Sequence, residues 1–283
     1  MKTTNKTIFA TLLVAALAGV RTPAAEVVTN GVTGYQDTPM QRDGRWHVHD
    51  PARPQPAIVT PGATFSQGAP PPSDAVVLFD GHGLAKWQND QGGDAAWPTQ
   101  DDYVETKSHS GGIRTRGKWA DFQLHVEWST PNPPTGTGQG RGNSGILINN
   151  MYEVQVLDSY ASKTYPDGQA AAIYGQSPPL VNASKPPGEW QTYDILFESP
   201  RWNAKGELTK KAVITVLHNG VVVQNRYELT GCTDGINDAV PWRTLSKYAA
   251  PHPPECFIEL QDHSNPVRYR NIWVRSMHLG ANQ

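Results

Sequence analysis

The sequence of 283 residues has few cysteines, few methionines and no surplus of charge of either sign. Its 24 basic and 26 acidic residues give a formal net charge of −2, so no basic field predicts binding to nucleic acid. No His or Cys cluster has the spacing that is typical of zinc sites. Beyond the N-terminus, no apolar run is long enough to span a bilayer.

One long apolar run does occur, at residues 8–20, after Lys2 and Lys6 and before the small residues Ala24 and Ala25. A charged start, an apolar stretch and a small-residue end are typical of a secretory signal peptide. We therefore expect residues 1–25 to be a signal peptide and the mature protein to be periplasmic or secreted, with no membrane attachment. A retained anchor is the alternative.

Cys232 and Cys256 are the two cysteines of the chain. In an exported protein they meet an oxidising compartment, where disulfides form and persist. We expect a disulfide that closes a loop of about 25 residues and contributes on the order of 3 kcal/mol. Two unpaired thiols are the alternative.

Residues 26–74 are rich in proline and glycine and show little periodicity, which favours extended, non-helical chain. We interpret them as a linker or strap lying over the surface of a domain that begins near residue 75. The denser stretch 46–50, Trp-His-Val-His-Asp, is expected to dock on that domain.

From residue 75 onward, short alternating segments separated by turn residues predict strands, and no stretch has a sustained helical period. Asn219-Gly220 predicts a hairpin between two of them. The pattern is typical of an antiparallel sandwich or jelly roll. The main expected strands are 76–79, 103–106, 113–115, 122–128, 145–148, 151–157, 190–197, 212–217, 221–226, 256–261 and 267–274.

Long polar side chains alternate along three of these strands, and they would line a groove if the strands share one face. Solvated surface is the alternative, because antiparallel sheets commonly wet one face. The loop 131–142 is long enough to suggest a functional role. The long irregular segment 159–188 is expected to build a wall or a lid of a site. The alternating side chains are Gln123, His125 and Glu127; Glu153 and Gln155; and Glu259, Gln261 and His263.

The strand that begins at Glu153 has a frame similar to that of laminarinase-type sandwich glycosidases, which carry Glu-x-Asp-x-x-Glu. In that motif the two Glu residues act as nucleophile and acid. Here Gln155 replaces the middle carboxylate, and Asp158 stands where the last Glu would be, needing a bulge to reach the same face. Ordinary two-carboxylate hydrolysis is therefore disfavoured.

Between residues 75 and 275 the chain resembles the 3-keto-disaccharide hydrolase family, whose members are also described as 3-keto-glucoside 1,2-lyases and 3-keto-2-hydroxyglucal hydratases. Gln191 stands where that family often has Asn, and segments 46–62 and 231–254 lie outside the common core. The matching pieces are short, and their order carries the resemblance: Leu78-Phe79-Asp80-Gly81 with Leu84 and Trp87; Asp121-Phe122-Gln123-Leu124 with Glu127-Trp128; Asn143-Ser144-Gly145-Ile146; Tyr152-Glu153-Val154-Gln155-Val156-Leu157-Asp158; Gly188-Glu189-Trp190 with Tyr193; Asn219-Gly220; and Leu260-Gln261-Asp262-His263 with Val267, Arg268, Tyr269 and Arg270-Asn271-Ile272.

The resemblance implies an all-β, concanavalin-like jelly-roll sandwich of two antiparallel sheets, with a catalytic domain at residues 75–283. It also implies glycosides oxidised to a ketone at C3 as substrates. That ketone acidifies the C2 proton, so a base can remove it, the C1 aglycone leaves by β-elimination, and water then adds. Net hydrolysis needs a base, an acid and a group that stabilises the enolate, and an upstream sugar 3-dehydrogenase would supply the ketone.

Role assignments within this scheme are hypotheses. His263 is the first choice for the base, because its unperturbed pKa lies near neutrality, and Glu153 is the second candidate or the acid. Arg268 or Arg270 is expected to stabilise the enolate. A divalent metal ion that bridges the ketone and the C2 hydroxyl would also acidify C2, and the residues leave its presence open. Side chains expected to hold the sugar are Glu127, Gln155, Gln261 and Tyr174.

Two other functions remain open from the sequence. A non-catalytic carbohydrate-binding module of the same fold would bind sugar without turnover. A laminarinase-like hydrolase would cleave unoxidised β-glucan, against which Gln155 argues.

Overall fold

The computed structural model describes residues 25–63, 66–233, 235 and 241–277. The predicted signal peptide lies outside the described residues, apart from Ala25. The described chain contains no α-helix, and its two helical segments are single 3-10 turns, η1 (Gly138–Gly140) and η2 (Pro166–Gly168). Neither has the length or the apolar character that crossing a membrane would need.

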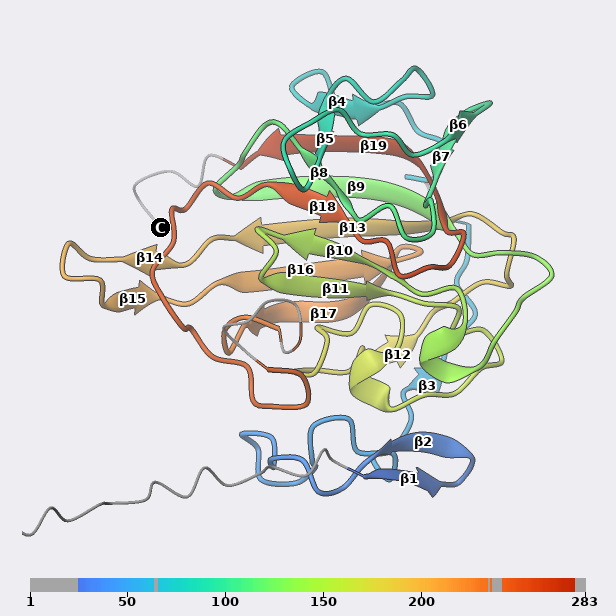
Figure 1. Cartoon of the computed structure of the whole chain (residues 1–283), viewed down its shortest axis with the longest axis vertical. Coiled ribbons are helices and arrows are strands. Elements are labelled where there is room, and N and C mark those ends of the chain that lie inside the picture. Colours follow the sequence, from blue (N-terminus) through green and yellow to red (C-terminus); the bar gives the residue numbers. More distant parts are fainter. Residues whose placement is uncertain (1–24, 64–65, 234, 236–240, 278–283) are drawn as a thin grey trace, which may run out of the picture.

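Two antiparallel sheets face each other and form a jelly-roll sandwich, as predicted (Figure 1). The larger sheet has the order β17-β16-β13-β9-β19-β7-β6, with β4 also paired to β19. Its strands are β4 (Val76–Phe79), β6 (Thr99–Gln100), β7 (Tyr103–Glu105), β9 (Phe122–Ser129), β13 (Gln191–Glu198), β16 (Val213–His218), β17 (Val221–Glu228) and β19 (Arg268–Ser276).

The smaller sheet has the order β11-β10-β18-β8-β5. A further two-stranded ribbon, β14 (Arg201–Trp202) with β15 (Leu208–Lys210), projects from one side of the molecule (Figure 1, left). The strands of the smaller sheet are β5 (Trp87–Asn89), β8 (Ile113–Thr115), β10 (Ser144–Ile148), β11 (Tyr152–Val156) and β18 (Ile258–Leu260).

Local sequence explains the hairpin between β10 and β11. Asn149 and Asn150 adopt positive φ values of 57° and 49°. This left-handed conformation is the one that a tight hairpin turn requires and that Asn tolerates well. Asn219 and Gly220 connect β16 to β17 in the same way, with φ values of 51° and 78°. The hairpin predicted at Asn219-Gly220 is confirmed.

The core lies between the two sheets and is built from the inward positions of each strand. On β9, Phe122, Leu124, Val126 and Trp128 are all fully buried, as the alternation predicted. The smaller sheet contributes the facing layer with Ile146, Ile148, Tyr152, Val154, Val156, Ile258 and Leu260. The opposite positions of each strand are thereby left for the outer faces of the sandwich.

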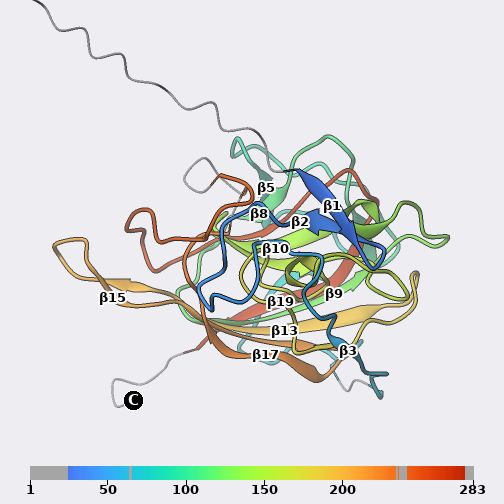
Figure 2. The ribbon, with the colours of Figure 1, turned by 90° about the horizontal axis from the view of Figure 1, so that it is seen from below.

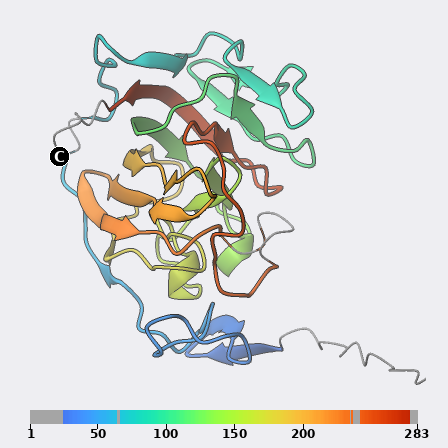
Figure 3. The ribbon, with the colours of Figure 1, turned by 90° about the vertical axis from the view of Figure 1, so that its left-hand side faces the viewer.

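The N-terminal strap lies over the sandwich. It begins with the hairpin of β1 (Glu26–Thr29) and β2 (Val32–Tyr35), which sits at one end of the molecule (Figures 1 and 2). It then runs along one side, where β3 (Ala57–Ile58) pairs in parallel with β12 (Val181–Asn182), and reaches β4 at the other end (Figure 3). Val48 and His49 are fully buried, so the predicted docking of 46–50 is confirmed.

The expected disulfide between Cys232 and Cys256 is wrong, because both cysteines are free and buried. Each cysteine belongs to a different backbone pairing: Cys232 with Lys247, and Cys256 with Trp119. The Cys256 thiol contacts Ser199 Oγ and the carbonyl oxygen of Pro254 instead. Burial raises the pKa of both thiols, that of Cys256 to about 11, which keeps them protonated and unreactive.

Candidate functional site

The outer face of the smaller sheet carries the predicted polar pair. Glu153 and Gln155 alternate on β11 with the core residues Tyr152, Val154 and Val156, so both point away from the core. The irregular segment that follows β11 pairs with the free edge of that strand. Tyr174 donates its backbone N–H to the Glu153 carbonyl, and Ala171 donates to the Gln155 carbonyl. The side chains of Glu153 and Gln155 are only 3% and 1% exposed.

Strand register brings Gln261 to the same place. Gly145 on β10 lies opposite Gln155 and accepts the backbone N–H of Gln261 on its other side at 3.0 Å. Gly145 has no side chain, and this leaves space between the side chains of Glu153 and Gln261 on the outer face of the sheet. A Cβ there would lie 2.7 Å from Glu153 Oε1 and 3.2 Å from Gln261 Oε1. The carboxylate of Glu153 and the amide of Gln261 thus occupy the space above one glycine.

A cavity of about 400 Å³ opens over this glycine, within the size range of small-molecule sites. Five of the eight predicted site residues line it, namely His263, Glu153, Gln155, Gln261 and Tyr174. His263 is exposed, on the loop after β18. Its neighbour Asp262 anchors that loop by accepting the backbone N–H groups of Ser110 and Ser264, each at 2.8 Å.

Gln139, from the loop 131–142 that was expected to have a functional role, was not predicted as a site residue. Its amide donates to Thr164 Oγ1 at 2.9 Å and to the Gly168 carbonyl at 2.8 Å, and its Oε1 accepts from Gln155 Nε2 at 3.1 Å. Gln139 therefore fixes the amide of Gln155 and ties together the two loops that wall the cavity.

A pair of tyrosines forms another wall. Tyr165 and Tyr174 lie on the segment 159–188 that was expected to build a wall, and their hydroxyls are 2.6 Å apart. The ring of His49 from the strap packs against both, with centroid distances of 4.2 Å and 4.9 Å. Asp167 accepts the backbone N–H of His49 at 3.0 Å, and its Oδ2 lies 3.4 Å from His49 Nδ1.

Two amide oxygens of the cavity lining are buried without a hydrogen-bond partner, Gln261 Oε1 and Asn143 Oδ1. Asn143 Nδ2 donates to the Gln139 carbonyl at 2.7 Å, which fixes the orientation of its amide. A buried polar atom without a partner in the chain needs one from outside it, such as a water molecule or a ligand. Both atoms are acceptors, so they suit the hydroxyl donors of a sugar.

The remaining three predicted site residues lie elsewhere. Glu127 belongs to β9, and Arg268 and Arg270 belong to β19, both in the larger sheet. The condition for one common groove, that all three polar rows share a face, is therefore not met, because the row on β9 belongs to the other sheet. Alternation gives the face of each strand but not the sheet that the strand joins. Arg268 pairs with Glu105 at 2.8 Å, and Arg270 pairs with Glu127 and Asp102, each at 2.8 Å.

Glu127 and its neighbours hold the strap. Gly68 donates its backbone N–H to Glu127, and Ser66 donates to Asp194 at 3.0 Å. His125 lies between the two carboxylates, 2.7 Å from Asp194 and 3.7 Å from Glu127. Burial opposes the ionisation of Glu127, yet hydrogen bonds from His125, Asn271, Gly68 and Arg270 lower its pKa to about 2. This cluster is an anchor for the strap.

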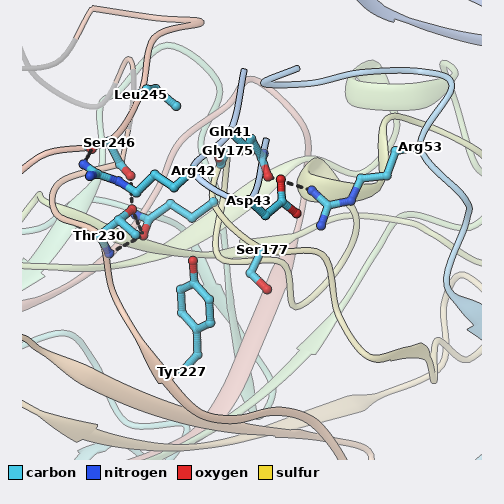
Figure 4. Close-up of a pocket in the computed structure, with 11 residues that line it drawn as sticks. Gln41, Arg42, Asp43, Arg53, Gly175, Ser177, Tyr227, Thr230, Leu245 and Ser246 are labelled. Atoms are coloured by element: carbon cyan, nitrogen blue, oxygen red, sulfur yellow. Dashed lines mark hydrogen bonds between the residues drawn. The ribbon is translucent and has the colours of Figure 1, made fainter. Parts of the chain in front are cut away.

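A second cavity, of about 260 Å³, lies between the strap and β17 (Figure 4). Arg42 donates to the Ser246 carbonyl at 2.9 Å, and Arg53 donates to Gln41 at 2.8 Å. Arg42 thus ties the strap to the domain and Arg53 fixes Gln41 within the strap, so this cavity belongs to the docking of residues 41–53. The site over Gly145 therefore remains the candidate.

No group of three or more His, Cys, Asp or Glu side chains suited to a metal ion occurs among the residues that the structure describes. The described residues therefore provide no such set of ligands for the divalent ion that the sequence analysis considered.

Comparisons with known proteins bear on the family. The model of the 3-keto-alpha-glucoside-1,2-lyase-like domain matches residues 74–275, more than half of the chain. A "putative glycosyl hydrolase" from Parabacteroides distasonis is 42% identical, with a TM-score of 0.68, and the match covers 80% of this chain and 93% of that one. The search among curated proteins found no match.

Two further "putative glycosyl hydrolase" structures from the same organism are 17% and 22% identical, with TM-scores of 0.49 and 0.48. Each match covers 72% of this chain, and 94% and 99% of the other chain respectively. The matched range 74–275 contains every residue predicted for the site. The chain belongs to the 3-keto-disaccharide hydrolase family, defined by a 3-keto-alpha-glucoside-1,2-lyase-like domain.

Proposed function

We propose that this protein is an exported enzyme that cleaves 3-keto-glycosides by elimination and hydration at the cavity over Gly145. The composition of that cavity carries the proposal. Glu153 is the single carboxylate among the described residues that line it. Glycoside hydrolysis by a pair of carboxylates would require a second one on the other side of the bond, whereas elimination next to a ketone requires only one base and one acid.

His263 takes the proton from C2, which the C3 ketone has made acidic, and the enolate forms. Glu153 gives its proton to the glycosidic oxygen as the bond between that oxygen and C1 breaks. The aglycone leaves as an alcohol, and C1 and C2 become doubly bonded. Water then adds across this bond, with its hydroxyl on C1 and a proton on C2. The sum of the two steps is hydrolysis.

Negative charge on the enolate oxygen calls for hydrogen-bond donors in a site shielded from water. Arg268 and Arg270 are engaged in ion pairs on the other sheet. Donors in the cavity itself are the paired hydroxyls of Tyr165 and Tyr174 and the amide groups of Gln155 and Gln261. We assign the enolate to this group and the orientation of sugar hydroxyls to the oxygens of Gln261 and Asn143.

Release of a chromogenic aglycone tests the proposal. The purified protein is given a nitrophenyl 3-keto-glucoside and, separately, the unoxidised parent, each with and without a chelator. We expect release from the keto form only. Loss of that release with the chelator would add a metal ion to the scheme. Glu153→Gln and His263→Ala are each expected to lower kcat by about 100-fold or more, whereas exposed His82→Ala serves as the control.

Release from the unoxidised parent would contradict the proposal and favour a hydrolase. Saturable sugar binding without any turnover, unchanged in Glu153→Gln, would favour a binding module. An upstream sugar 3-dehydrogenase is part of the proposal, since the ketone has to be made before this enzyme can act.

A further inference from the structure

The tyrosine wall of the candidate site has a buried imidazole ring behind it. Tyr165 and Tyr174 line the cavity over Gly145, whereas His49, which packs against both rings, does not line it. The His49 side chain is fully buried. A ligand in the cavity therefore meets the tyrosines, and His49 can act on it only through them.

Asp167 gives this ring a buried counterion. Its Oδ2 lies 3.4 Å from His49 Nδ1, and neither side chain is exposed to solvent. Burial raises the pKa of Asp167, yet the charge and hydrogen bonds of His49 and the charge of Arg53 together hold it below its usual value. Arg53 acts from behind Gln41, which it contacts at 2.8 Å and which donates to Asp167 at 2.9 Å. A buried carboxylate requires a cationic partner, and the His49 ring, as imidazolium, is the one in direct contact.

The carboxylate next to His49 in the strap is engaged elsewhere. Asp50 accepts the backbone N–H of Ala52 at 2.9 Å and the Gln36 amide at 3.2 Å. The charge on the His49 ring thus faces Asp167 on one element and the two tyrosine rings on the segment around it. A cation against the face of an aromatic ring is itself a favourable contact.

A positive ring behind two phenols strengthens their hydroxyls as hydrogen-bond donors, because a nearby cation favours the ionised form of an acid. The hydroxyl oxygens of Tyr165 and Tyr174 are 2.6 Å apart. Hydroxyls joined in this way polarise one another. Both effects grow where water is excluded. Negative charge that develops in the cavity beside these hydroxyls is therefore stabilised more than a neutral group in the same place.

We infer that His49 is a positioning residue whose positive ring makes an oxyanion site of the paired hydroxyls of Tyr165 and Tyr174. The inference rests on the proposed function for the nature of the oxyanion, which is the enolate oxygen of the 3-keto sugar. His49 lies outside the range 74–275 that the family model matches, so the N-terminal strap completes the site.

Binding of a stable enolate analogue tests this without any reaction. Ascorbate is a polyhydroxylated ring compound whose enol group is ionised at neutral pH, and methyl glucoside is a neutral sugar of similar size. Calorimetry without oxygen gives the dissociation constants of both for the wild type and for His49→Phe, which keeps an aromatic ring behind the tyrosines and removes its charge. His82→Phe is the same change at an exposed position and serves as the control.

The wild-type protein should bind ascorbate about tenfold more tightly than methyl glucoside. His49→Phe should lose this preference and keep its affinity for methyl glucoside within about twofold, and His82→Phe should behave as the wild type. Equal weakening of both ligands would show a loosened wall and overturn the inference. A wild type without the preference, or a His49→Phe protein that retains it, would overturn it as well.

A doubly substituted protein, His49→Phe with Asp167→Asn, guards against misfolding of the single variant. Removal of one partner of a buried charge pair leaves the other charge uncompensated, whereas replacement of both leaves none. This protein should show the same loss of the preference for ascorbate. An unaltered preference would overturn the inference.

Turnover separates this inference from the proposed function. With a nitrophenyl 3-keto-glucoside, His49→Phe should lower kcat by about tenfold and leave KM within about twofold, since the neutral ground state carries no enolate charge. An unchanged kcat would overturn the inference. If the wild type releases no aglycone at all, the proposed function fails, and the preference for ascorbate alone decides whether the hydroxyl pair is an oxyanion site.

Discussion

The hydroxyls of Tyr165 and Tyr174 meet at 2.6 Å on one wall of the cavity. Both rings pack against His49, which comes from the strap more than a hundred residues earlier in the chain. His49 adopts a φ of 60°, a conformation that costs free energy for a non-glycine residue and is tolerated where the surroundings enforce it. The wall of the site is thus supported by a segment outside the family domain.

Replacement of His49 by Ala should loosen this wall. The ring is fully buried, and loss of a large buried side chain leaves a cavity that costs about 2–4 kcal/mol. His49 also lowers the pKa of Asp167 against the opposing effect of burial, so Asp167 loses a favourable neighbour. We expect a lower free energy of unfolding and a lower kcat, measured by urea denaturation and by aglycone release.

His49→Phe separates packing from charge, since it keeps a ring against the two tyrosines. If His49→Phe recovers only part of the stability that His49→Ala loses, the remaining loss is assigned to the missing interaction with Asp167. If His49→Ala were as stable and as active as exposed His82→Ala, the supporting role of His49 would be refuted.

Gly145→Ala should displace the carboxylate of Glu153. The added Cβ would lie 2.7 Å from Glu153 Oε1, closer than real contacts of this kind allow. Displacement of a catalytic group by about 1 Å can cost about 100-fold in rate, so we expect that loss in kcat with little change in the unfolding curve. Gly62→Ala is the control, since a Cβ there meets nothing within 4 Å. Full activity of Gly145→Ala would argue against Glu153 as a reacting group.

Glu259 should make stability depend on pH. Burial raises its pKa to about 7, with help from the charge of Asp90 and partial opposition from Arg114. A folded-state pKa above the unfolded value of about 4.5 means that the folded protein binds the extra proton. Protonated Glu259 therefore makes its full contribution to the free energy of unfolding, on the order of 3 kcal/mol, below about pH 4.5. This contribution is lost as the pH rises through about 7.

Glu259→Gln removes this titration. Urea unfolding should give similar stabilities for the wild type and the variant near pH 5, and a more stable variant near pH 8. The same difference between variant and wild type at both pH values would show that Glu259 does not titrate in this range.

The thiols of Cys232 and Cys256 should react only after unfolding. Both are buried and free, and burial raises the pKa of each. A thiol reagent should find no reactive group in the native protein purified without reductant, and two groups in denaturant. A reductant should leave the melting temperature unchanged. A chain lighter by two hydrogens, with no thiols after unfolding, would instead reveal a disulfide.

The sequence predicted the floor of the site well, because local signals define it. Alternation on β11 gives the outward direction of Glu153 and Gln155, and the turn at Asn149 and Asn150 sets the pairing of β10 with β11. These signals act over neighbouring residues, where period and turn type determine the geometry.

The walls and the second sheet could not be predicted in the same way. Glu127 alternates on β9 as Glu153 does on β11, yet β9 joins the larger sheet, and only long-range pairing decides this. Gln139 and Tyr165 lie in loop segments, where no period indicates the direction of a side chain. The contact of His49 with Asp167 joins positions that no local pattern relates.

Proton transfer at C2 is the central claim, and isotope incorporation tests it most directly. The protein is given a 3-keto-glucoside in D₂O, and the 3-keto-glucose formed is analysed at C2 by NMR at early times, beside 3-keto-glucose alone in D₂O to correct for spontaneous exchange. Elimination followed by hydration predicts one deuterium at C2 of each product molecule. Product that keeps its original hydrogen at C2 would show direct hydrolysis and contradict the account.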